Sequence, residues 1–103
     1  MAAKRLQLIL SSEDFSRLTI SEFSDNGLQI VVDVHGMKCF HARRFINNII
    51  NTVHCEFQLV IIHGYNHGTA IKNMLAEDFS NSHIEERHLD VDNQGVTHLL
   101  MAA

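Results

Sequence analysis

Proline is absent from the 103 residues, and no stretch is of low complexity. Because flexible linkers are usually rich in proline, glycine or serine, no linker stands out, and the length fits one compact domain. The two cysteines, Cys39 and Cys55, fall near opposite ends of one predicted helix, so we do not expect them to form a disulfide. This use of cysteine predicts a reducing, cytoplasmic location.

Long apolar runs and an excess of positive charge are missing too. The stretch LQLIL near the start is short and is followed by SSEDF, so it predicts neither an export signal nor a membrane span. The net charge of −4 is unlike that of most nucleic-acid-binding domains. Residues 73–103 carry one arginine and six acidic residues, however, whereas residues 1–72 are nearly balanced. Charges are screened beyond about 8 Å at physiological salt, so a site in the first two-thirds need not feel the acidic last third.

What the chain does contain is an alternation of strand and helix patterns. The apolar stretch LQIVVDV predicts a buried strand over 28–34, and FQLVII predicts another over 57–62. Helical periodicity predicts amphipathic helices over 37–54 and 69–80. Their inward residues are Ala42, Phe45, Ile46, Ile49, Ile50 and Val53 in the first, and Ile71, Met74 and Leu75 in the second. An exposed strand over 84–91 and a last strand over 96–101 complete the pattern.

The order β-α-β-α-β-β predicts an α/β fold. We expect a two-layer sandwich in which two helices cover one face of a mixed four-stranded sheet, with the first two strands parallel. Residues 1–27 are harder to assign, because LQLIL fits an edge strand while SSEDFSRLTISEF fits a short helix capped by Ser11 or Ser12, or an extended segment. We therefore expect an N-terminal arm or extra edge element over 1–27 and the domain proper over 28–102.

Each predicted parallel strand ends in a His-Gly pair. Ligands bind at the carboxyl ends of strands in open α/β sheets, so Asp33, His35, His63 and the YNHGT loop should converge there. Each loop also leads into a helix N-terminus, which favours an anion. Asp33 and His35 could form an acid–base pair or a structural brace. No C-x2-C or H-E-x-x-H pattern occurs, so no metal ligands are predicted.

Three motifs in order, VDVHGM, VIIHGYNHGTAIKNML and NQGVTHLL, resemble those of the Smr (small MutS-related) domain family over about residues 28–102. The resemblance implies the fold of the C-terminal domain of bacterial translation initiation factor three. It also implies DNA or RNA as partner and a nicking or RNA-cleaving endonuclease activity. Asn66 stands where the family loop usually has its middle glycine, and Tyr65 where a basic residue is frequent. The alternative is therefore a protein- or nucleic-acid-interaction module that has lost the chemistry.

The candidate site residues follow from these patterns and the resemblance together. Three are candidate catalytic residues: Asp33, His35 and His63. Ten are candidates for binding nucleic acid or phosphate: Gly36, Lys38, His41, Arg44, Gly64, Tyr65, Asn66, His67, Gly68 and Thr69. Thr69 is also a predicted N-cap. The competing interpretation of Lys38, His41 and Arg44 is a solvated helix face, and that of Tyr65 and His67 is an exposed loop. The sequence leaves open a divalent cation as cofactor, a protein partner and the oligomeric state.

Overall fold

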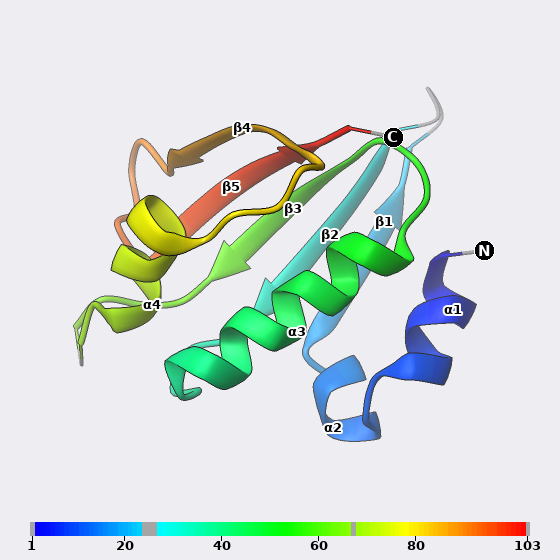
Figure 1. Ribbon diagram of the computed structural model, residues 1–103, viewed down its shortest axis with the longest axis horizontal. Coiled ribbons are helices and arrows are strands. Elements are labelled where there is room, and N and C mark those ends of the chain that lie inside the picture. Colours follow the sequence, from blue (N-terminus) through cyan, green and yellow to red (C-terminus); the bar gives the residue numbers. More distant parts are fainter. Residues whose placement is uncertain (1, 24–26, 67, 103) are drawn as a thin grey trace.

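The computed structural model describes residues 2–23, 27–66 and 68–102 as an α/β domain around a five-stranded mixed sheet (Figure 1). The strands are β1 (Leu18–Glu22), β2 (Leu28–Asp33), β3 (Phe57–Ile62), β4 (Ile84–Leu89) and β5 (Val96–Met101). The helices are α1 (Ala2–Ile9), α2 (Ser12–Phe15), α3 (Cys39–Thr52) and α4 (Ala70–Asn73), and α4 continues as the π-helix η1 (Met74–Asp78). Within these described ranges, no helix has the length and apolar character needed to cross a membrane.

The strand order is β1-β2-β3-β5-β4. Strands β2 and β3 are parallel, as predicted, with Asp33 opposite Ile62, and every other pair is antiparallel. The last strand, β5, therefore inserts between β3 and β4. The pairing of Ile62 with Val96 brings the start of β5 to the end of β3, which positions the turn before β5 beside the predicted site.

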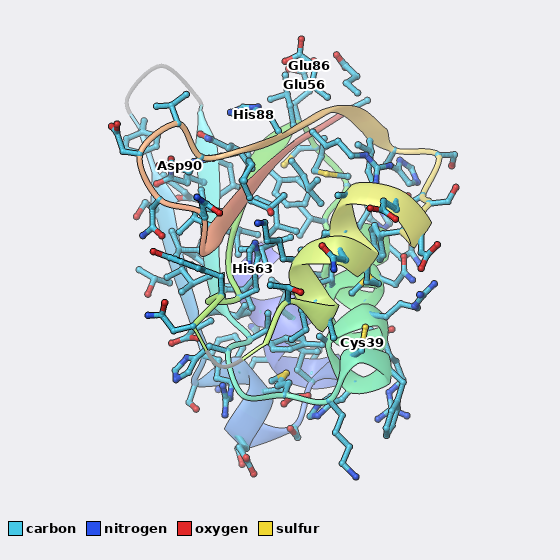
Figure 2. All side chains as sticks on the ribbon, turned by 90° about the vertical axis from the view of Figure 1, so that its left-hand side faces the viewer. Cys39, Glu56, His63, Glu86, His88 and Asp90 are labelled. Carbon is cyan, nitrogen blue, oxygen red and sulfur yellow. The ribbon has the colours of Figure 1, made fainter. Side chains whose placement is uncertain are left out.

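The core lies on the side of the sheet where α3 and α4 pack (Figures 1 and 2). Side chains alternate along the strands, so Ile30 and Val32 of β2 and Leu59 and Ile61 of β3 are fully buried. All nine predicted inward residues of the two helices are buried as well. The opposite face of β2 carries Gln29, Val31 and Asp33, which are only half-buried. Strand β2 is thus buried on the face that the helices cover and half-buried on the other.

The predicted four-stranded sheet was wrong, because β1 adds a fifth strand. Its inward residues, Leu18 and Ile20, lie opposite Val32 and Ile30 of β2 and extend the apolar surface. The stretch LQLIL is helical rather than an edge strand, and Leu6 and Leu10, one helical turn apart, are buried in the core. The SSEDF stretch is the short helix that the sequence allowed.

Helix α2 is capped by Ser11, whose Oγ accepts a hydrogen bond from the backbone N–H of Asp14 at 3.0 Å. At the other end of the domain, Arg87 of β4 fastens the end of η1. One guanidinium nitrogen, Nη1, donates to the carbonyls of Leu75 and Phe79, both at 2.7 Å. The predicted helix over 69–80 ends at Asp78, two residues early, and changes from α to π within its length.

Candidate functional site

A cleft of about 520 Å³ opens at the carboxyl ends of β2 and β3, where the sequence predicts the site. Three segments form it: the turn from β2 to α3, the loop from β3 to α4, and the turn from β4 to β5. The described residues that line it are His35, Gly36, Met37, Ile62, His63, Gly64, Tyr65, Asn66, Gly68, Ala70, Ile71, Asn93 and Gly95. Residues of both predicted His-Gly segments thus line the same cleft, together with Asn93 and Gly95 from the β4–β5 turn.

Asp33 and His35 form a hydrogen-bonded pair at the edge of the cleft. Nδ1 of His35 lies 2.5 Å from Oδ1 of Asp33, and the backbone N–H of His35 donates to the same oxygen at 3.1 Å. Asp33 lies on the half-buried face of β2, and its side chain is 39% exposed, so its carboxylate keeps contact with water. The His35 side chain is 66% exposed. When Nδ1–H donates to Asp33, Nε2 of His35 keeps a lone pair and can accept a proton from a ligand in the cleft.

His63 lies at the end of β3 and points inward, where 6% of it is exposed (Figure 2). Its Nδ1 lies 2.8 Å from the carbonyl oxygen of Gly64, which can only accept, so Nδ1 carries the proton. Its Nε2 therefore accepts from the hydroxyl of the buried Thr97 at 2.8 Å. Burial lowers the pKa of His63 below its usual value, opposed by the Gly64 hydrogen bond and assisted by the charge of Lys72. The ring is thus neutral at pH 7 and both its nitrogens are engaged.

We expect this neutral histidine to make the domain less stable in mild acid. The unfolded chain binds a proton at His63 near the usual pKa, about 6.5, whereas the folded chain binds it only at lower pH. The unfolding free energy should therefore fall as pH decreases through about 6.5, and His63→Gln should remove this contribution. Denaturant unfolding between pH 7.5 and 5 measures it, with the exposed His54→Gln as control. Equal pH dependence in wild type and His63→Gln would contradict the prediction. An NMR titration of the His63 ring tests it without any variant.

The β4–β5 turn holds the cleft loop through Gly95. The carbonyl of Gly95 accepts from the backbone N–H groups of His63 at 2.8 Å and Gly64 at 3.0 Å. A Cβ on Gly95 would lie 3.1 Å from Cα of Gly64 and 3.3 Å from Cδ1 of Tyr65, so any side chain here would require these neighbours to shift by a few tenths of an ångström. Gly64 itself has a φ of +73°, which turns the chain away from β3. Oδ1 of Asn93 accepts from the N–H of Gly95 at 2.8 Å and shapes the turn.

A row of polar side chains across the half-buried face of the sheet anchors the same turn. Gln29 donates to Gln58 at 3.3 Å, and the Gln58 amide donates to Nδ1 of His98 at 3.1 Å. Nε2 of His98 then lies 2.7 Å from Oδ1 of Asp90. The other oxygen of Asp90 accepts the backbone N–H groups of Asp92 and Asn93. These hydrogen bonds, with that from His98 contributing most, lower the pKa of Asp90. The turn is thereby tied to β2, β3 and β5.

The basic residues predicted to bind phosphate, Lys38, His41 and Arg44, differ in their surroundings. Lys38 occupies the N-cap position of α3, and Lys38 and Arg44 are exposed. Nε2 of His41 lies 3.2 Å from Oδ2 of Asp14, so His41 contacts α2 rather than standing free. Lys72 was not predicted. Its Nζ donates to Gln94 of the β4–β5 turn at 3.3 Å, between Asn93 and Gly95 of the cleft lining, so the cation stands just outside that lining, at the rim.

Thr69 and His67 are the remaining predicted residues of the loop before α4. Thr69 stands before α4 as expected, but its hydroxyl accepts from the Asn73 amide at 3.2 Å instead of capping a backbone N–H. His67 lies outside the described residues. In the part of the chain that is described, no group of three His, Cys, Asp or Glu side chains could hold a metal ion.

Sequence reasoning missed Lys72, Asn93, Gly95 and Thr97 as parts of the site. The stretch DNQG indicated only a turn, since nothing local shows that its glycine would support a loop some thirty residues away. No protein-family model, curated protein or solved structure matches the chain.

Proposed function

We propose that this chain is a nucleic-acid-binding domain that cleaves phosphodiester bonds. The observation that carries the proposal is the Asp33–His35 pair, in which a carboxylate orients an exposed imidazole at the edge of a cleft. The motif resemblance to the Smr domain supports the same reaction class. As part of the same proposal, the fold is the two-layer sandwich of that family. The protein is proposed to act in the cytoplasm.

In the proposed reaction, Nε2 of His35 accepts the proton of the nucleophile. The nucleophile is the 2′-hydroxyl in RNA or a water molecule in DNA. It attacks phosphorus, a new P–O bond forms, and the bond to the leaving oxygen breaks. The leaving oxygen takes a proton from solvent. Asp33 keeps the proton of His35 on Nδ1 and stabilises the imidazolium that forms.

His63 serves this proposal as a positioning residue. Its ring is engaged on both sides, by Gly64 and Thr97, and so it fixes the loop that closes the cleft. Lys72 supplies a positive charge at the rim, in place of the basic residue that is frequent where this chain has Tyr65. Lys38 and Arg44, at the start of α3 and along it, would bind flanking phosphates.

A cleavage assay on structured RNA and on supercoiled DNA, with and without divalent metal ions, tests the proposal. Cleavage should be present in the wild type and lost in Asp33→Ala. Cleavage that persists in Asp33→Ala, or its absence from the wild type under all these conditions, would refute the enzymatic part of the proposal.

Salt dependence measures the proposed phosphate contacts. Lys72→Ala should weaken binding to every nucleic-acid sequence and lower the slope of log affinity against log salt by about 0.7–0.9, because one phosphate contact is lost. Fluorescence anisotropy over a salt series measures both effects. Lys4→Ala is the matched control, since Lys4 lies on α1, at the opposite side of the domain from α4 (Figure 1). Equal slopes in the two variants would show that Lys72 contacts no phosphate.

One observation favours the second candidate function, a nucleic-acid- or protein-interaction module without catalysis. The backbone N–H groups of His63 and Gly64 both donate to Gly95, so they are not directed at a substrate phosphate. Binding that follows the salt prediction, without cleavage under any of the assay conditions, would establish this function instead.

A further inference from the structure

The described lining of the cleft carries no permanently charged side chain. None of its described lining residues is Asp, Glu, Lys or Arg. Met37, Ile62 and Ile71 supply apolar side chains, and Asn66 and Asn93 supply amides. The charged groups stand outside this surface, with Asp33 behind His35 and Lys72 held by Gln94. A phosphate is unsuited to such a lining, whereas a flat, uncharged ring with polar edges matches it.

Tyr65 forms one wall of this cleft. The ring packs against the backbone at Gly95, where an added Cβ would lie 3.3 Å from Cδ1. The residue is nevertheless 44% exposed, so part of it remains open to a ligand. An aromatic ring held from behind and open in front is a platform on which a nucleobase can stack.

The two amides can read the edge of a ring stacked there. Oδ1 of Asn93 is engaged by Gly95, which leaves its NH₂ group as a donor without a partner in the described residues. Asn66, the residue after Tyr65, has no side-chain hydrogen bond within the same part of the chain. Asparagine amides pair with the donor and acceptor edges of bases.

We infer that the cleft binds one unpaired nucleobase, stacked on Tyr65 and contacted by Asn66 and Asn93. This inference rests on the proposed function and names its substrate class, which is single-stranded or locally unpaired nucleic acid. A base seated in the cleft leaves its own sugar and phosphate at the rim, beside His35 and Lys72. The volume of about 520 Å³ is within the usual range for a small-molecule site. A base inside a duplex cannot enter unless it leaves the stack.

Binding to matched oligonucleotides tests the inference. The probes are a labelled eight-nucleotide single strand, the same strand with abasic residues throughout, and its duplex, all at low salt and checked for integrity by gel. We expect the single strand to bind most tightly, since the abasic strand keeps the phosphates but lacks the bases. Tyr65 is the only tyrosine and tryptophan is absent, so the intrinsic emission reports on Tyr65 alone and should be quenched by the single strand.

Two substitutions at Tyr65 complete the experiment. Tyr65→Ala should weaken single-strand binding roughly 5- to 150-fold and leave abasic binding unchanged, whereas Tyr65→Phe should bind like the wild type. Equal affinity for intact and abasic strands would overturn the base site, even if a variant failed to fold, because that comparison needs only the wild type. If salt-dependent binding persisted in that case, the proposed function would stand without the base site. No binding to any probe would refute both.

Discussion

Replacing His35 with alanine should lower the cleavage rate by about 10²–10⁴-fold, the usual contribution of a positioned general base. The fold should be unaffected, because the His35 side chain is 66% exposed and, among the described residues, hydrogen-bonds only to Asp33. Surface substitutions of this kind change the unfolding free energy by no more than about 0.5 kcal/mol. Initial cleavage rates and denaturant unfolding of the same samples measure the two effects.

Asp33→Asn and His54→Ala complete this test. Asp33→Asn keeps the shape of the pair and removes the charge that holds Nδ1–H of His35, so the rate should fall while stability changes little. His54→Ala removes an exposed histidine just before β3, at the end of the sheet away from the cleft, and should leave the rate unchanged. A brace would give the opposite pattern, a loss of about 1–3 kcal/mol in stability with the rate per folded molecule preserved.

Gly95→Val should both destabilise the domain and close the cleft. A Cβ at this position already lies 3.1 Å from the backbone of Gly64, and the two methyl groups of valine add further overlap. Overpacking of this kind costs about 1–3 kcal/mol, or roughly 4–8 °C in Tm for each kcal/mol in a domain of this size. Thermal unfolding and binding of the single-stranded probe measure the outcome.

Two comparisons isolate the close approach at Gly95. Gly95→Ala should show a smaller loss, because Gly64 and Tyr65 need to shift by only a few tenths of an ångström. Asp92→Val places the same bulk at an exposed position of the same turn, where the Asp92 side chain forms no hydrogen bond or ion pair with any described residue and only its backbone N–H is engaged. If Gly95→Val were as stable as Asp92→Val, the packing of Gly95 against Gly64 could not be what supports the loop.

The parts of the fold that were predicted correctly have strong local periodicity. Helix α3 shows its buried face in every turn, and β3 alternates fully buried and half-buried residues along its whole length. Strand β1 has only two inward apolar residues, Leu18 and Ile20, and becomes a strand because β2 offers it a partner. The LQLIL stretch has the composition of a strand, but Leu6 and Leu10 meet the core only at the spacing of a helix.

In the candidate site, too, the features set by local sequence were predicted and those set by non-local pairing were not. Asp33 and His35 were predicted together because they are two positions apart at the end of one strand, a spacing that places side chains on the same face. The position of His63 at a strand end was predicted, but the engagement of its ring was not, because Thr97 reaches it only through the register of β3 with β5. Gly95 and Lys72 depend on the same non-local pairing, which no local pattern encodes.

Because β5 inserts between β3 and β4, the cleft can form only after β5 has been synthesised and has paired with β3. During synthesis, the residues of β2, α3, β3 and α4 leave the ribosome before Gly95 and Thr97 do. Until β5 pairs with β3, the His63–Gly64 segment has no acceptor for its N–H groups and the Tyr65 ring has nothing behind it. The cleft is therefore complete only once β5 has paired with β3, and a chain without that pairing would carry the Asp33–His35 pair without the surface that would bring a substrate to it.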